Sequence, residues 1–246
     1  MKKILLFAMA LLLSVPVPGF AQSDDGEEEI TPIKEKKHAF FLGIKAGGTM
    51  TSLNQQPNEG KLYDAADFGF SGGLVLMARF GRASENSVGG TGYFSAGLEL
   101  KYKQNNVKTF GTDEKGKEKA KLSLGYFEAP VFVHLYPLAK SPTFNSLYIE
   151  AGASFAGTMS RSPKSLALDN PNSEFSQVIY YLDGNDSKLK GMDIRPFAGI
   201  GLTIPGSGFD ISGRYYIGTS ELAKNFPCKM NTLEVSLAWL FNIGTF

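Results

Sequence analysis

LEVSLAWLF, residues Leu233–Phe241, alternates large apolar side chains with small or polar ones. The apolar phase consists of Leu233, Val235, Leu237, Trp239 and Phe241. Glu234 and Ser236 fall on the other phase. A period of two residues is that of a β-strand, whose successive side chains point to opposite faces. This stretch therefore predicts a strand with one wholly apolar face.

Seven earlier segments repeat the same alternation, so the sequence predicts eight strands. The other segments are Phe40–Gly47, Phe68–Phe80, Phe94–Lys103, Tyr126–Leu135, Leu147–Phe155, Asp193–Ile204 and Phe209–Ile217. After His38 the period of two dominates over the 3.6-residue period of a helix. The chain is therefore expected to be all-β.

One face of all eight segments carries no ionisable side chain, whereas the other carries twelve. These are Lys45, Arg79, Glu99, Lys101, Lys103, Glu128, Glu150, Asp193, Arg195, Asp210, Arg214 and Glu234. A soluble β-sandwich buries its apolar face and exposes its charges. A membrane barrel turns the apolar face toward lipid and the charges toward the lumen. In a narrow eight-stranded lumen, equal numbers of acids and bases predict a paired, structural charge network.

Three features favour the membrane barrel over a soluble periplasmic β-protein. Connections such as Asn105–Lys121 and Met159–Met192 are longer than the turns that follow them, which is typical of outer loops and periplasmic turns. Aromatic residues gather near strand ends, as in interfacial girdles. The apolar phase ending at Phe241 resembles the assembly signal of outer-membrane barrels, which leaves residues 242–246 as a short tail. We predict an eight-stranded antiparallel transmembrane up-and-down β-barrel with both termini in the periplasm.

Two local features require an explanation in such a barrel. Pro130 and Pro196 fall inside predicted strands, where each removes one ladder hydrogen bond. Leu122 and Leu124 are out of phase with the apolar face that contains Phe127. We therefore expect either a β-bulge near Gly125 or an upper part of this strand that stands clear of the lipid.

The N-terminal part has the pattern of an exported protein. Lys2 and Lys3 precede an apolar run, which is followed by small residues near Ala21. This pattern predicts a signal peptide over residues 1–21. Residues 22–37 are charged and predict a flexible tail. The barrel is expected over residues 38–241.

Two segments resemble a known family. YFEAPVFVHLY (Tyr126–Tyr136) looks like the aromatic-x-Glu-x-Pro strand of the PorT-like outer-membrane β-barrel group of Bacteroidota. FDISGRYYIGTSEL (Phe209–Leu222) is similar to the Arg-Tyr-x-x-Gly strand and following loop of that group. The resemblance implies an eight-stranded barrel in the outer membrane. One member group is associated with protein secretion.

Composition excludes several classes of function. The 246 residues contain 25 Lys+Arg, 24 Asp+Glu, two His and one Cys, so neither nucleic-acid binding nor a metal site or other cofactor is expected. Inward glycines lack a phosphate-loop context and would leave room for long charged side chains. Cys228 has no base near it in the sequence, so no catalytic residue is predicted.

We expect a non-enzymatic role in anchoring or interaction through the outer loops, as an accessory of secretion or transport. The partners would be outer-membrane lipids, the barrel-assembly machinery and a protein bound at loop 159–192, which contains the apolar-rich stretch Glu174–Leu182. A small-conductance channel is the first alternative. A lipid-modifying enzyme that uses His134 together with an acid such as Glu128 is the second.

Overall fold

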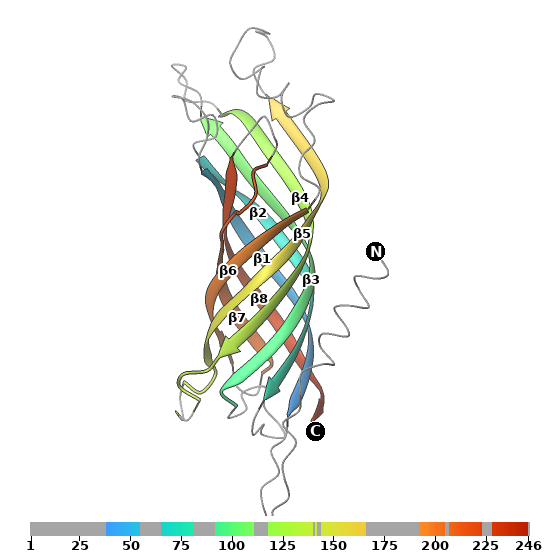
Figure 1. Cartoon of the computed structure of the whole chain (residues 1–246), viewed down its shortest axis with the longest axis vertical. Helices are drawn as coiled ribbons and strands as arrows, with labels where there is room; N and C mark the ends of the chain where they lie inside the picture. Colours follow the sequence, from blue (N-terminus) through green and yellow to red (C-terminus); the bar gives the residue numbers. More distant parts are fainter. Residues whose placement is uncertain are drawn as a thin grey trace, which may run out of the picture. The chain divides into compact units, whose positions relative to one another are not determined.

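The computed structural model describes residues 38–54, 65–80, 92–110, 118–139, 141, 144–165, 192–204, 207–222 and 228–245. These residues form eight strands (Figure 1). The strands are β1 (Ala39–Asn54), β2 (Ala65–Phe80), β3 (Phe94–Phe110), β4 (Glu118–Leu135), β5 (Leu147–Ser165), β6 (Met192–Thr203), β7 (Phe209–Tyr216) and β8 (Lys229–Thr245). The predicted signal peptide, the 22–37 tail and Glu174–Leu182 lie outside the described residues.

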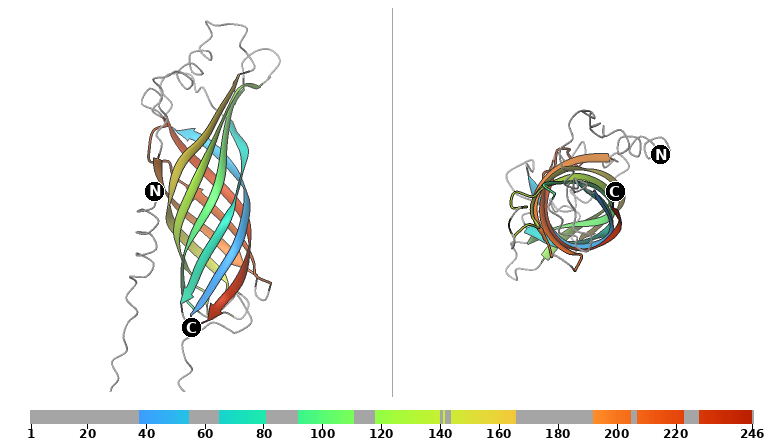
Figure 2. Two further views of the ribbon diagram at one scale, coloured as in Figure 1. Left: turned by 90° about the vertical axis from the view of Figure 1, so that its right-hand side faces the viewer. Right: turned by 90° about the horizontal axis from the view of Figure 1, so that it is seen from below.

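Each strand pairs antiparallel with its sequence neighbour, and β1 pairs with β8, so the sheet closes into a barrel (Figure 2). Closure removes free sheet edges along the paired part of the barrel. We call the end where β1 begins and β8 ends the termini end, and the opposite end the loop end. Among the described residues, no helix is long and apolar enough to cross a membrane.

The two faces of the barrel wall have the predicted polarity. Side chains of the apolar phase point outward and are exposed, as for Leu74 at 53% and Leu237 at 59%. Side chains of the charged phase point inward, and Glu99 and Glu234 are 1% and 0% exposed. An exposed apolar exterior around a charged interior is the polarity of a membrane barrel. The predicted fold class is therefore confirmed.

The strands on one side of the barrel are longer than the sequence pattern predicts. The expected loop Asn105–Lys121 is mostly strand, because β3 continues to Phe110 and β4 starts at Glu118. β5 likewise continues to Ser165, past the expected loop start at Met159. The connection 111–117 is consequently shorter than the one from 136 to 146, so the predicted alternation of long loops and short turns is wrong. These additions are mostly polar in sequence, and the buried Val107 stands alone among polar neighbours, so apolar periodicity could not reveal them.

β8 also extends beyond its predicted end. Asn242 pairs with Phe41 and Gly244 with Phe40, so residues 242–245 belong to the strand and the predicted tail is wrong. The register shifts at this point and leaves Ile243 as an extra residue. A β-bulge changes the phase of alternation by one residue. That phase change hides the continuation of β8 from the apolar alternation that ends at Phe241.

A register shift does occur near Gly125, but the bulge expected in β4 is wrong, because the extra residue lies on β5 and β4 keeps its phase. The β4–β5 register shifts between Gly125 and Tyr126 and leaves Met159 of β5 as the extra residue. Leu122 and Leu124 are each 1% exposed and keep the inward phase of β4. They therefore pack inside the barrel, which explains why they are out of phase with the lipid-facing residues.

The two prolines are accommodated where the ladder is already interrupted. The β3–β4 pairs stop at Leu98↔Val131 and resume at Lys101↔Glu128, so the gap contains Pro130. Pro196 pairs with Ala153 of β5, and its carbonyl accepts a hydrogen bond from the N–H of Ile217, just beyond the end of β7. The missing N–H of each proline therefore lies where no ladder hydrogen bond is formed with the neighbouring strand.

Candidate functional site

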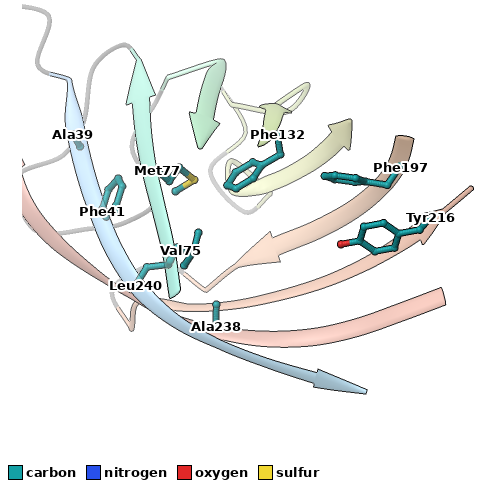
Figure 3. Close-up of a cluster of buried hydrophobic side chains, with 9 residues drawn as sticks. All are labelled: Ala39, Phe41, Val75, Met77, Phe132, Phe197, Tyr216, Ala238 and Leu240. Carbon is teal, nitrogen blue, oxygen red and sulfur yellow. The ribbon is translucent and has the colours of Figure 1, made fainter. Parts of the chain in front are cut away.

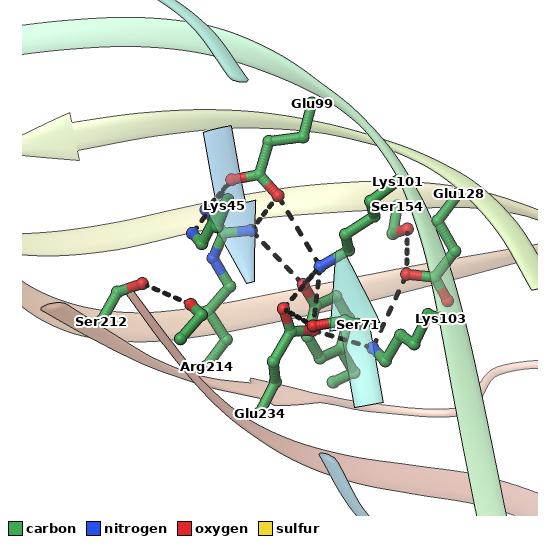
Figure 4. A network of polar contacts seen from close by, with 12 residues as sticks. Lys45, Ser71, Glu99, Lys101, Lys103, Glu128, Ser154, Ser212, Arg214 and Glu234 are labelled. Atoms are coloured by element: carbon green, nitrogen blue, oxygen red, sulfur yellow. Dashed lines mark hydrogen bonds and ion pairs between the residues drawn. The ribbon is translucent and has the colours of Figure 1, made fainter. Parts of the chain in front are cut away.

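The candidate site is the barrel interior, where Arg214 is the central cation (Figure 4). Its Nη1 and Nη2 atoms donate to the two carboxylate oxygens of Glu99, each at 2.7 Å. Nη2 also donates to Glu150 Oε2 at 2.6 Å, and Nε donates to Glu150 Oε1. Lys45 Nζ donates to Glu99 Oε1 at 3.0 Å. Strands β1, β3, β5 and β7 are therefore joined across the lumen by charge-assisted hydrogen bonds.

A second cluster surrounds Glu234 of β8. Lys101 Nζ lies 2.8 Å from both carboxylate oxygens of Glu234 and donates to the Tyr216 hydroxyl at 2.9 Å. Ser71 Oγ donates to Glu234 Oε1 at 3.1 Å. Lys101 Nζ is also 3.6 Å from Glu99 Oε2, so this cluster is continuous with that of Arg214.

The network continues toward the loop end through Lys103 and Arg195. Lys103 Nζ lies 3.3 Å from Glu234 Oε2 and 3.6 Å from Glu128 Oε2. Arg195 donates from Nη1 to Glu128 at 3.1 Å and from Nε to Asp193 at 2.7 Å. The structure thus brings ten of the twelve predicted lumen charges into one chain of contacts: Lys45, Glu99, Lys101, Lys103, Glu128, Glu150, Asp193, Arg195, Arg214 and Glu234.

The other two predicted charges lie nearer the termini end and have different contacts. The Arg79 guanidinium stacks 3.7 Å from the centroid of the Tyr136 ring and donates to a backbone carbonyl. Asp210 accepts hydrogen bonds from the hydroxyls of Tyr148 and Thr203, each at 2.9 Å. Both charges are buried and approach the network through aromatic rings, because Tyr148 stacks on His134 and the Tyr136 hydroxyl lies 3.5 Å from His134 Nδ1.

His134 is buried between aromatic rings and paired with a carboxylate. Its Nε2 atom is 2.7 Å from Glu150 Oε2, directly across the β4–β5 ladder. The ring is stacked between Phe132 at 4.6 Å and Tyr148 at 4.0 Å, and it is 5% exposed. Glu128, the acid considered as a partner from the sequence, instead binds lysine and arginine side chains. Because His134 faces the lumen, it has no access to lipid.

Apolar side chains close the lumen on the termini side of the network (Figure 3). One cluster runs from the start of β1 up to the network and contains Ala39, Phe41, Val75, Met77, Phe132, Phe197, Tyr216, Ala238 and Leu240. Beyond the end of β4, Tyr136, Ala139 and Tyr148 form a smaller cluster. Packed rings and aliphatic chains therefore occupy the lumen at this level.

A second apolar cluster closes the lumen on the loop side. Its members are Val107, Leu122, Leu124, Tyr126, Ala156, Leu222, Cys228 and Met230. The connection after β7 contributes to it, because the N–H of Leu222 donates to the carbonyl of Cys228 at 2.9 Å. Burial raises the pKa of the Cys228 thiol to about 12, which makes it a poor nucleophile.

Along a single strand the interior passes through three layers: the loop-side apolar cluster, the charge network and the termini-side apolar cluster. On β8, Met230 belongs to the loop-side apolar cluster, Glu234 to the network and Leu240 to the termini-side cluster.

Two described cavities, one bordering Arg214 and one bordering Asp193, each have a volume of about 10 Å³. Such a volume holds roughly one water molecule. The described residues contain no metal-binding cluster of three or more His, Cys, Asp or Glu.

Aromatic side chains are the interior partners that sequence analysis did not select. Lys103 Nζ lies 3.3 Å from the centroid of the Tyr216 ring, and the Arg195 guanidinium lies 4.2 Å from that of Tyr126. These tyrosines share the inward phase of their strands, which was the available signal. Inward glycines make room for rings as well as for charged chains, since a Cβ atom at Gly97 would overlap the Phe132 ring.

With this fold and interior in place, the sequence was compared with known proteins. Residues 20–223 match the family described as "Outer membrane protein beta-barrel domain". The chain belongs to this family. It is an outer-membrane β-barrel protein, and its apolar exterior lies in lipid. No curated protein matches the sequence.

Solved structures with some similarity are also outer-membrane proteins. Ail of Yersinia pestis, in complex with the heparin analogue sucrose octasulfate, is 12% identical, with 82% of this chain and 99% of that chain covered and a TM-score of 0.41. Neisserial surface protein A is 12% identical over 84% and 100% of the two chains, with a TM-score of 0.40. OprG of Pseudomonas aeruginosa is 10% identical over 82% and 96%, with a TM-score of 0.41. Similarities of this size do not indicate function.

Proposed function

We propose that this protein is a sealed, non-enzymatic outer-membrane anchor that presents its loop end to a protein partner, as an accessory of secretion or transport. The observation that carries the proposal is the three-layered interior, in which apolar clusters lie on both sides of a paired charge network. Such a lumen offers neither a path for solutes nor an open pocket for a substrate. Its function is therefore assigned to its surface.

The sealed interior argues against the channel alternative. An ion would have to pass two apolar layers, and unpaired charge in an apolar layer is costly. We expect no discrete current steps when the purified protein is incorporated into planar lipid bilayers, with a porin in the same bilayer as the positive control. Reproducible unitary steps that require the folded protein would contradict the proposal.

The enzyme alternative is also disfavoured by geometry. His134 is enclosed by two rings and its carboxylate partner, so neither ring nitrogen can reach a lipid headgroup. The carboxylate of Glu128 is ion-paired with Lys103 and Arg195. A general base needs hydrogen-bond access to the proton that it removes.

The part of β5 that extends past β6 at the loop end supports an interaction role. The β5–β6 ladder ends at Gly157↔Met192, yet β5 continues to Ser165 while paired with β4 on its other side. Among the described residues, residues 160–165 of β5 pair with β4 alone, and an extended polypeptide can join such a strand by main-chain hydrogen bonds. Residues 166–191 follow β5 directly, and we place the partner contact there. The PorT-like resemblance makes a secretion component the proposed partner.

Photo-crosslinking in living cells tests this contact. We expect a cross-linking amino acid at position 162, in the part of β5 that extends past β6, to give one discrete adduct with a cell-envelope protein. The same cross-linking amino acid placed at Ser207, which is exposed at the termini end, is the matched control and should not give that adduct. Deletion of residues 166–191 should weaken the Ser162 adduct. Identical adducts from both positions, or none from Ser162, would refute the proposal.

The remaining assignments follow from the same orientation. We propose that residues 1–21 direct export, that both termini face the periplasm, and that Leu233, Val235, Leu237, Trp239 and Phe241 present the assembly signal to the barrel-assembly machinery. The outward exposure of all five side chains, from 44% to 59%, supports this last assignment. A signal read by another protein has to be accessible before the barrel closes.

A further inference from the structure

A small cavity lies at the loop end of the lumen, where β6 stops pairing with β5. Three of its lining residues, Tyr126, Arg195 and Met230, are 3% exposed or less and form a buried floor. The polar residues around this floor are half-buried, namely Thr158, Asp193, Ser220 and Glu221. A group that arrives from the loop end can therefore enter between them. We call this cavity the vestibule.

The vestibule has one negative charge that no neighbouring cation balances. The network of ten charges contains five acids and five bases, so its formal charges cancel. Glu221 lies outside this network, and the structure gives its carboxylate no ion pair or hydrogen bond among the described residues. The vestibule is therefore complementary to one positive charge.

Asp193 adds an acceptor that has no donor. Its Oδ2 atom accepts a hydrogen bond from Arg195 Nε at 2.7 Å, whereas its Oδ1 atom is buried and has no hydrogen-bond partner among the described residues. A buried acceptor without a partner is unfavourable, and a donor placed beside it removes that cost. Glu221 and Asp193 thus call for a group that is both cationic and a hydrogen-bond donor.

Size and charge together select an ammonium group. The volume of the vestibule, about 10 Å³, holds roughly one water molecule. An ammonium group is compact and carries three donors, whereas a guanidinium is a wider, planar fork with five. One monovalent cation balances Glu221, but a divalent metal ion would leave an excess of positive charge. A lysine side chain fits these conditions better than an arginine side chain or a metal ion.

The vestibule borders the part of β5 at which we place the protein partner. Thr158 lines the vestibule and comes directly after Gly157, the last residue of β5 that pairs with β6. Residues 160–165, which pair with β4 alone among the described residues, start two positions later. An extended polypeptide paired with them would pass the start of β6 next to the vestibule.

We propose that the vestibule receives the ammonium group of a lysine side chain of the partner polypeptide. The ammonium group donates to the carboxylate of Glu221 and to Oδ1 of Asp193, and it balances the charge of Glu221. Main-chain pairing with β5 would then give affinity, and the vestibule would select a segment with a lysine at one position. This inference rests on the proposed function and specifies the chemistry of the partner.

Carbodiimide cross-linking in isolated outer membranes, combined with the photo-adduct at position 162, tests the contact. A carbodiimide joins a carboxylate to an amine and leaves a guanidinium unreacted. We expect Glu221 or Asp193 to become joined to a lysine of the protein captured at position 162. E221Q should lower the yield of that photo-adduct about fivefold, the upper range for a partly exposed ion pair. D113N removes the same charge from the connection 111–117 and should keep the wild-type yield.

The outcomes separate this inference from the proposed function. A photo-adduct at position 162 that E221Q does not weaken would overturn the inference and leave the proposed function standing, whereas no photo-adduct in the wild type would overturn both. A carbodiimide adduct of lipid mass would assign the vestibule to an aminophospholipid headgroup. A photo-adduct weakened by E221Q without any lysine adduct would assign it to another cation. Either result would overturn the lysine assignment. A heat-dependent gel shift checks that E221Q is folded.

Discussion

Replacing Arg214 with methionine should lower the free energy of unfolding by about 3–5 kcal/mol, the usual effect of removing one partner from a buried ion pair. Arg214 neutralises Glu99 and Glu150 together, and all three side chains are 1% exposed. Without it, Glu150 keeps only His134 as a described ion-pair partner. Denaturant unfolding in detergent, followed by the fluorescence of Trp239, the single tryptophan, measures the loss.

The double variant R214M/E150Q is the matched control for this prediction. It removes the carboxylate left with least compensation, while Glu99 keeps Lys45 at 3.0 Å and Lys101 at 3.6 Å. We therefore expect the double variant to be more stable than R214M alone and to recover about half of the loss, because an unpaired buried charge is worse than a neutral amide. If R214M unfolds at the wild-type denaturant concentration, the network does not stabilise the barrel.

Placing an arginine at Leu74 should destabilise the folded, membrane-inserted barrel by about 2–4 kcal/mol, the cost of arginine on the lipid face near the bilayer midplane. Leu74 is 53% exposed and pairs with Ile44 and Leu100 near the middle of the apolar belt. Its side chain would have to carry the charge into hydrocarbon. Unfolding from lipid vesicles and the heat-dependent gel shift measure the effect.

Ser52→Arg is the comparison for the lipid-face prediction. Ser52 is an exposed residue of β1 close to the loop end, and the cost of a lipid-face arginine falls to about 0–1 kcal/mol near the interface. A depth-dependent difference between the two variants is what a membrane-embedded exterior requires. Equal effects at both positions would mean that the outer face does not sit in a bilayer.

Alternation and charge placement in the sequence were sufficient to predict the strands, their faces and the barrel. A residue such as Lys101 or Arg195 in an otherwise apolar alternation identifies the phase that cannot face lipid, since an uncompensated charge there is too costly. The same reasoning selected the twelve lumen charges. It could not divide them into the ten that ion pairs join and the two, Arg79 and Asp210, whose described partners include tyrosine side chains.

The errors of sequence analysis share one cause: polar or bulged strands carry no clear period. β3 and β4 run past Asn105 and Lys121 because backbone pairing continues after the apolar belt has ended. Leu122 and Leu124 were hard to place because apolar residues occur both on the lipid face and in the interior plug. At β8, one extra residue at Ile243 concealed a strand that continues to Thr245.

By itself, the sequence determined what each strand face can tolerate, because side-chain polarity and a period of two are local properties. Only the tertiary structure decided which partners meet. The register of the closed barrel placed Glu150 opposite His134 and brought Glu99 and Glu150 to one guanidinium. Register is set jointly by all eight pairings and their bulges, so a shift of one residue in any strand would change every one of these contacts.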